Sequence, residues 1–218
     1  FDRNGVLRMV PNVDFNAAVL SCAKTVIVEI NRGFVAPAGG LAIDPNRIDY
    51  ALESDASLPE IAPPQLDDAS LRIGERVAGL IQDGDCLQTG IGAIPAAILG
   101  QLTHKNDLGL HGGLLDGGGQ ALIQSGNVTG QRKAIDQGQH VTGMALGDHS
   151  FFNWLSDASD VVFRSANYTH DVDIIRQLDQ FVSINSAVEV DLFGQVNAEV
   201  AGGRQISGTG GSVDFMRA

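Results

Sequence analysis

The chain is poor in cysteine and in long apolar segments. Its 218 residues include two cysteines, Cys22 and Cys86, whose spacing fits neither a disulfide framework nor a Cys-x-x-Cys zinc motif. We expect both to be buried, reduced thiols. No apolar run approaches the ~18 residues that a membrane-spanning helix requires. The sequence therefore offers no spanning segment and no disulfide scaffold.

Basic residues are also scarce. Lys and Arg number 14 against 26 Asp and Glu, which gives a formal net charge of -12. Nucleic acids and anionic membranes attract proteins through basic surfaces, so this balance argues against either as a general partner. With 44% hydrophobic and 18% charged residues, the chain has enough apolar side chains for one large or two small domains with a core.

Glycine, by contrast, is abundant and gathers in two loops, residues 88–95 (QTGIGAIP) and 207–215 (SGTGGSVDF). Glycine reaches positive φ at little cost and leaves N–H groups free to face a phosphate or a developing oxyanion. Pro95 suits the first position of a helix, so we expect Gly90 and Gly92 at a helix N-terminus, which favours negative charge. Two tight turns would give the same pattern. Together the loops favour a cleft for an anionic, elongated ligand.

Short apolar segments alternate with helical ones, which predicts an α/β fold with parallel strand pairs. The expected strands are residues 25–30 (buried), 48–52 (half-exposed), 107–111, 140–146, 161–163 and 181–184, and the expected helices are residues 71–81, 121–124 and 171–178. We expect Asp68 and Ser70 to cap the first helix and Gly84 to end it. Residues 188–200 alternate as strands or a hairpin do. An apolar helix face for the core or a subunit interface is predicted at Phe151, Phe152, Trp154 and Leu155.

The segments around the two loops resemble a known family. Residues 185–197 (NSAVEVDLFGQVN), followed by 207–215, are similar to the acetyl-CoA hydrolase/transferase family, which includes acetate and 4-hydroxybutyrate CoA-transferases. Residues 88–95 match its Gly-Ile-Gly-Ala-Ile-Pro motif, and residues 55–60 its acidic segment ending in Leu-Pro-Glu. The resemblance spans nearly the whole chain.

This resemblance implies a fold of two related α/β CoA-transferase domains with the active site between them. Because family members are longer, we expect residues 1–66 to be the C-terminal part of the first domain plus a linker. Residues 67–218 would then be the second domain, incomplete at its C-terminus. The proline-containing segment 62–68 marks the boundary. The resemblance also implies coenzyme A as a substrate without a metal, acyl-CoA and small carboxylic acids as partners, and a cytoplasmic homo-oligomer.

In the family, a glutamate attacks the acyl-CoA thioester and forms first an acyl-glutamyl anhydride and then a glutamyl-CoA thioester. Its strand ends in a Leu-His-Thr-Glu-like motif, whereas this chain reads Leu-His-Gly-Gly at 110–113. Gly113 stands at the glutamate position and cannot form an anhydride. Three explanations remain open: another carboxylate or a water performs the chemistry, the protein binds CoA esters without turnover, or the glutamate was mutated.

The candidate site residues follow from these motifs. The catalytic candidates are His111, Gly113 as the position of the family glutamate, Asp116, and the strand-borne Glu189. The CoA- or acyl-binding candidates are Gln88, Gly90, Ile91, Gly92, Asn185, Gly208, Gly210 and Gly211. For three of the catalytic candidates the alternative is a structural role: His111 as a strand-end histidine, Asp116 as a helix cap or turn residue, and Glu189 as a structural acid.

The remaining polar residues carry weaker indications. Four histidines, His104, His140, His149 and His170, show no metal-like spacing, and we expect no metal site. The basic residues Arg132, Lys133, Arg164 and Arg204 are phosphate donors or salt-bridge partners. A nucleotide-binding oxidoreductase is a weaker reading, because the first loop lacks the full G-x-G-x-x-G spacing.

Overall fold

A five-stranded parallel sheet forms the centre of the protein. In the computed structural model, which describes residues 1–218, its strands are β5 (Cys86–Thr89), β6 (Gly109–Leu110), β8 (His140–Thr142), β10 (Val161–Phe163) and β11 (Phe181–Ile184). Two sets, β11-β5-β6 and β8-β10, are joined by a parallel bridge between His111 and Val141. This order confirms the prediction of an α/β fold with parallel pairs.

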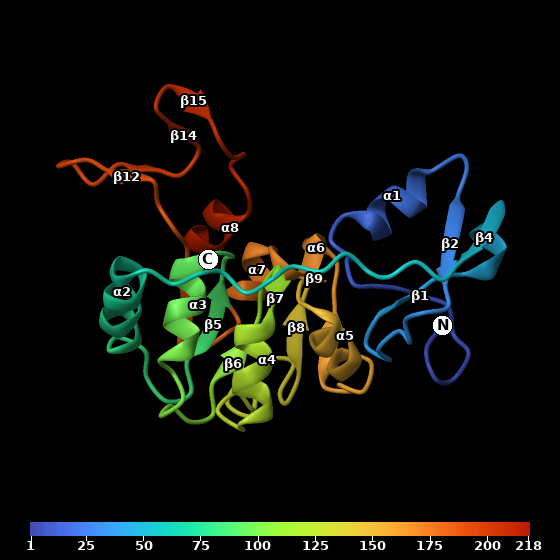
Figure 1. Cartoon of the computed structure of the whole chain (residues 1–218), viewed down its shortest axis with the longest axis horizontal. Helices are drawn as coiled ribbons and strands as arrows, with labels where there is room; N and C mark the ends of the chain where they lie inside the picture. The colour runs from blue at the N-terminus through green and yellow to red at the C-terminus, as the bar shows by residue number, and fades with distance from the viewer.

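Helices cover this sheet and the ends of its strands (Figure 1). They are α2 (Asp68–Ala78), α3 (Ala93–Gly100), α4 (Gly117–Gln124), α5 (His149–Leu155), α6 (Ala166–Thr169), α7 (Val172–Ile175) and α8 (Ser212–Arg217). The N-cap of α2 is Asp67, whose carboxylate accepts from the Ser70 amide, rather than Asp68 or Ser70. The helix ends at Ala78, before the expected Gly84, because Gly79 already serves as its C-cap.

The hydrophobic core lies between these helices and the sheet. Leu87 of β5 and Leu99 of α3 are almost fully buried, as is Leu155 of α5. Phe151 is also buried, with its ring 5.7 Å from that of the half-buried Trp154. The apolar face predicted on this helix therefore packs in the core.

The N-terminal segment adds smaller elements. They are β1 (Arg8–Met9), α1 (Asn16–Cys22), β2 (Ile27–Asn31), β3 (Leu41–Ala42), a 3₁₀ helix η1 (Pro45–Arg47) and β4 (Tyr50–Ser54). The expected strand at 25–30 was predicted to be buried, which is wrong: Ile27 is 63% exposed. Strand β2 pairs in parallel with β4 alone, and its side chains alternate between an exposed face with Ile27 and a half-buried face with Val28 and Ile30. Cys22 is likewise exposed, while Cys86 is buried as expected.

One stretch of this segment joins the main body. The Val13 amide donates to the Gly143 carbonyl (2.8 Å), and the Ala145 amide donates to the Pro11 carbonyl (2.8 Å). This places residues 11–14 beside the short parallel pair β7 (Leu114–Leu115) and β9 (Met144–Ala145). Residues 55–67 then run without helix or strand across the molecule to α2 (Figure 1).

The C-terminal part projects from the sheet as two small hairpins (Figure 1). They are β12 (Glu189–Val190) with β13 (Val196–Asn197), and β14 (Val200–Ala201) with β15 (Arg204–Gln205). This confirms the hairpin predicted there. The chain then returns to α8, where Phe215 is buried with its ring 6.2 Å from that of Phe181 in β11. The glycine-rich segment that precedes α8 is thereby brought back to the sheet.

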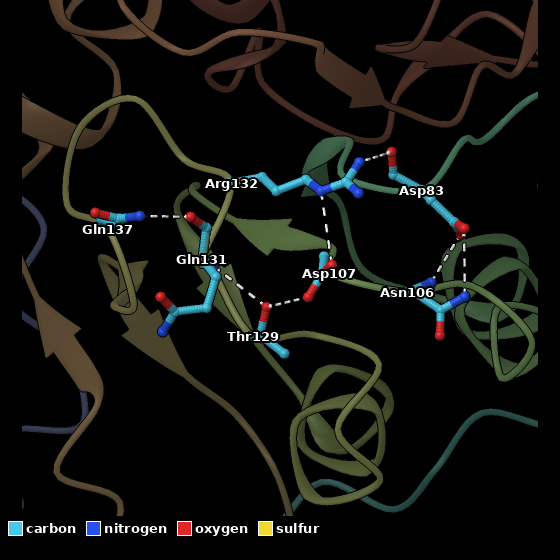
Figure 2. Close-up of polar contacts among 7 residues, drawn as sticks. All are labelled: Asp83, Asn106, Asp107, Thr129, Gln131, Arg132 and Gln137. Carbon is cyan, nitrogen blue, oxygen red and sulfur yellow. Dashed lines mark hydrogen bonds and ion pairs between the residues drawn. The ribbon is translucent and has the colours of Figure 1, made fainter.

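A polar network ties together the loops at the amino ends of β5 and β6 (Figure 2). The Asp83 carboxylate accepts from the Asn106 amide (2.8 Å), and Arg132 donates to the Asp83 carbonyl (3.2 Å) and lies 3.6 Å from Asp107. Arg132, considered above as a phosphate donor or a salt-bridge partner, is thus salt-bridged at the end of the sheet opposite the glycine loops. Such exposed pairs contribute little to stability.

Helices α2 and α3 approach closely because α2 presents its small buried residues Ser70, Gly74 and Ala78 at intervals of four along one face. A Cβ on Gly74 would lie 2.8 Å from the carbonyl carbon of Ala97. We therefore expect Gly74→Ala to lower the free energy of unfolding by about 1–2 kcal/mol, despite the higher helix propensity of alanine.

The matched control is Gly100→Ala in α3, where a Cβ meets nothing within 4 Å. It should be neutral or stabilising by about 0.5 kcal/mol. Urea denaturation of both variants measures the difference, and equal stabilities would contradict the close packing.

Candidate active site

Both glycine-rich loops open onto one cleft of about 1140 Å³. Seven of the expected site residues line it: Gln88, Gly90, Ile91, Gly113, Asn185, Gly210 and Gly211. An adjoining cavity of about 380 Å³ is lined by Ile91 again, together with Gly92 and Asp116. Gly208, His111 and Glu189 line neither space. No lysine or arginine lines either one.

The sheet explains why residues so distant in the sequence meet. Strands β5 and β11 are parallel, with Gln88 opposite Ser183 and Thr89 opposite Ile184. The loops that follow the two strands therefore begin side by side, at the edge where ligands bind in open α/β sheets. In Figure 1, α8 lies next to the same ends of β5 and α3.

Hydrogen bonds fix the strand ends at the floor of the cleft. The Gln88 Oε1 atom accepts from Ser183 Oγ (2.6 Å) and from Asn185 Nδ2 (3.1 Å). Asn185 Nδ2 also donates to Ser183 Oγ (2.9 Å). This network joins the two strands through their side chains and holds Asn185 beside the first glycine loop.

The first loop presents free amides. The Gly90 amide donates to the Ile184 carbonyl (3.2 Å), whereas the amides of Ile91, Gly92 and Ala93 donate to no protein acceptor. Gly92 has φ +109° and is the N-cap of α3, so the backbone there requires glycine. Pro95 is the third residue of this helix rather than the first. The amides and the helix N-terminus together favour an oxyanion or another negative group.

The space beside Gly113 is occupied by another side chain. A Cβ on Gly113 would lie 3.0 Å from Cε1 and 3.3 Å from Nε2 of His170. A Cβ on Gly211, in the second glycine loop, would also collide with the His170 ring. The imidazole therefore lies between the expected glutamate position and the second loop, inside the cleft.

His170 is held from several sides. Its Nδ1 lies 2.8 Å from Thr169 Oγ1, and its ring centre lies 4.7 Å from that of Phe215. Burial lowers the pKa of His170, and the carboxylates of Asp214 and Asp14 oppose this shift. Burial in turn raises the pKa of Asp14, which His170 counteracts. The cleft thus contains a neutral imidazole flanked by two carboxyl groups.

Sequence reasoning missed both His170 and Asp14. His170 lacked metal-like spacing, and Asp14 belongs to no motif. They reach the cleft from the end of α6 and from the segment beside β9, so only the folded arrangement brings them together. The one available signal was the short polar run 168–171 (YTHD) between two expected elements.

His111, the histidine favoured by the sequence, is 1% exposed and lies outside the cleft. Neither of its ring nitrogens has a hydrogen-bond partner, and burial lowers its pKa to about 4. It therefore packs as a neutral residue of the core at the end of β6.

Two further candidates have structural contacts. Asp116 is the N-cap of α4, where its carboxylate accepts from the amides of Gly118 (3.0 Å) and Gly119 (3.1 Å). Glu189 is exposed on the first hairpin and accepts from the Asn197 side chain (3.0 Å). The structure holds no group of three or more His, Cys, Asp or Glu arranged to bind a metal. None of its helices combines the length and apolar character that crossing a membrane requires.

Comparison with known proteins places these features in context. A family model described as the acetyl-CoA hydrolase/transferase C-terminal domain matches residues 147–218. The chain is 37% identical over 216 residues to a 4-hydroxybutyrate coenzyme A transferase of Clostridium kluyveri, covering 99% of this chain and 50% of the relative. It is 34% identical to a butyryl-CoA:acetate CoA-transferase of Anaerostipes caccae, with the same coverage of both chains.

Two solved structures are similar to this chain over nearly its whole length. RipA from Yersinia pestis superposes with a TM-score of 0.88 at 33% identity, over 99% of this chain and 48% of that one. A 4-hydroxybutyrate CoA-transferase from Porphyromonas gingivalis gives 0.86 at 30% identity, over 99% and 52%. The chain spans about half the length of the relatives that it matches.

The burial of His111 generates a pH prediction. Its pKa is about 4 in the folded chain against 6.5 unperturbed, so between these values the unfolded chain binds a proton that the folded chain does not. Its contribution to stability is therefore present at pH 7 and lost as the pH falls. Between pH 7 and pH 4.5 the free energy of unfolding should therefore fall by about 2 kcal/mol less in His111→Leu than in the parent.

Chemical denaturation at the two pH values measures this difference. The control is the exposed His104→Gln, which should follow the parent. A parallel loss in the parent and the His111 variant would show that His111 is not held neutral.

Proposed function

The chain belongs to the acetyl-CoA hydrolase/transferase family, and from this premise we propose that it binds an acyl-CoA in the cleft and acts on its thioester bond. The observation that carries the proposal is the convergence of both glycine loops and Gly113 on that one cleft. The free amides of Ile91 and Gly92 would receive the negative charge that develops on the thioester oxygen.

The residues of the cleft limit which reactions the protein could catalyse at the thioester. Gly113 carries no carboxylate, so no acyl-glutamyl anhydride forms at this position. The reaction is then either hydrolysis of the acyl-CoA or transfer of CoA to a carboxylic acid through another group. A CoA-ester binder without turnover is the second candidate, and the absence of the glutamate side chain is the observation in its favour.

The finer expectations belong to the same proposal. Residues 1–66 would be the end of a first CoA-transferase domain with its linker, and residues 67–218 much of the second. Relatives named for butyryl-CoA, acetate and 4-hydroxybutyrate support small carboxylic acids as the acyl groups and acceptors. We also propose that the protein is a cytoplasmic homo-oligomer and that it works without a metal.

Turnover is tested with acetyl-, butyryl- and succinyl-CoA, each with and without an acceptor carboxylate. Mass spectrometry of the acyl-CoA pool and a free-thiol assay separate the outcomes. New acyl-CoA would establish a transferase, and free CoA without new acyl-CoA would establish a hydrolase. Binding without either product would identify a binder.

The binding site is tested with Gly90→Val. Gly90 lines the cleft, and a Cβ placed on it would meet only Asn185 Oδ1, at 4.0 Å, so the new side chain would enter the ligand space. We expect the Kd for acetyl-CoA to rise at least about tenfold, equivalent to about 1.4 kcal/mol. Isothermal titration calorimetry measures it.

The matched control is Gly100→Val, at the other end of α3 and outside the cleft. Its Kd should remain that of the parent. Equal affinities in both variants would place the ligand elsewhere.

A further inference from the structure

The cleft contains an imidazole where the family resemblance predicts a carboxylate. His170 comes from the loop after α6, yet its ring fills the space that a side chain at position 113 would enter. Its contact with Gly211 ties the same ring to the second glycine loop. Glycine at both positions is therefore what allows the ring to lie here.

We propose that His170 is the catalytic base that activates a water molecule for direct hydrolysis of the acyl-CoA thioester. This inference rests on the proposed function, since it requires an acyl-CoA in the cleft. The inference gives the site a catalytic group, the His170 imidazole, in place of the glutamate that Gly113 lacks. It also favours hydrolysis over CoA transfer.

A base at this position needs its lone pair on Nε2, the nitrogen that lies 3.3 Å from the Cβ position of Gly113. The proton of the neutral ring is then on Nδ1, which has the Thr169 Oγ1 atom as its partner at 2.8 Å. In this tautomer the Thr169 hydroxyl accepts from Nδ1–H, and its own proton points toward the Ser165 carbonyl, 3.5 Å away. The proposal includes this tautomer.

The charges around the ring suit a neutral base. Asp14 of the N-terminal segment and Asp214 of α8 raise its pKa, and burial lowers it by more. Asp171, the next residue in the chain, also lines the cleft, and the buried His111 is close enough to interact electrostatically with His170. The imidazole is thus unprotonated near neutral pH, and the nearby carboxylates stabilise the imidazolium that forms during the reaction.

The reaction balances without a further reactant. The water oxygen attacks the thioester carbonyl carbon, a C–O bond forms, and the water proton moves to Nε2 of His170. The carbonyl electron pair moves to the oxygen and returns when the intermediate collapses. The C–S bond then breaks, and the proton on Nε2 passes to the departing sulfur. The products are a carboxylic acid and the CoA thiol.

The test compares His170→Gln with the exposed control His104→Gln, using acetyl-, butyryl- and succinyl-CoA as probes. In His170→Gln we expect hydrolysis to fall at least about a hundredfold, while the Kd for the acyl-CoA changes less than threefold. The parent rate should fall as the pH drops through a pKa below 6.5, and this limb should vanish in the variant. His104→Gln should keep the parent rate and the parent pH profile.

Gly113→Ala provides an independent variant that removes no functional group. Its methyl group would lie 3.0 Å from the His170 ring and push it aside by a few tenths of an ångström, so hydrolysis should fall by about threefold to tenfold, whereas Gly100→Ala should not change it. Circular dichroism melting verifies that each variant is folded.

Two results would overturn the inference: full hydrolysis in a folded His170→Gln protein, or acyl-CoA binding by the parent without hydrolysis. Absence of any acyl-CoA binding in calorimetry would instead refute the proposed function itself. The binding and turnover measurements therefore distinguish the two failures.

Discussion

The parallel pairing of β5 with β11 is the constraint on which the site depends. It places Gln88 beside Ser183 and Thr89 beside Ile184, so the loops that leave the two strands start from adjacent positions. The side chains of Gln88, Ser183 and Asn185 then close a hydrogen-bonded floor between them. If β11 slipped by one residue against β5, Ser183 would turn to the opposite face of the sheet while Gln88 kept its place, and the floor would be lost.

Gly113 and His170 belong to different segments of the chain, yet they meet in one part of the cleft. A glutamate at position 113 would come from the short segment between β6 and β7, whereas the imidazole of His170 reaches the same space from the end of α6. A Cβ at position 113 would lie 3.0 Å from the ring, so a side chain there requires the ring to shift. The chemical consequence is a change from a residue that would bond covalently to the substrate to one that would move a proton.

Much of the fold was predictable because local patterns determine it. Strands β10 and β11 coincide with the apolar runs predicted at 161–163 and 181–184, and the family motifs placed the two glycine loops at a common cleft. Exposure was harder to predict. The apolar run at 25–30 resembles a buried strand, but burial depends on how many faces other segments cover, and β2 leaves Ile27 exposed on one of its faces.

The site was predictable only in its backbone. Glycine motifs indicate where the chain bends, and Gly90, Gly210 and Gly211 line the cleft, whereas Gly208 does not. Side chains that arrive from other segments leave no pattern, which is why His170 and Asp14 were missed. His111 shows the converse, because a histidine at the end of a strand can face the core or the ligand, and the sequence does not distinguish the two.

The separation of β5 from β11 along the chain also bears on how the protein folds. Ser183 and Gln88, which share a hydrogen bond between β11 and β5, lie 95 residues apart in sequence. Contacts of such long range slow folding, because the entropy of closing the loop is lost before the contacts form. On a ribosome, β5 would emerge long before β11. The floor of the cleft would thus be among the last parts of the molecule to form, and until then the edge of β5 that faces away from β6 would lack its partner.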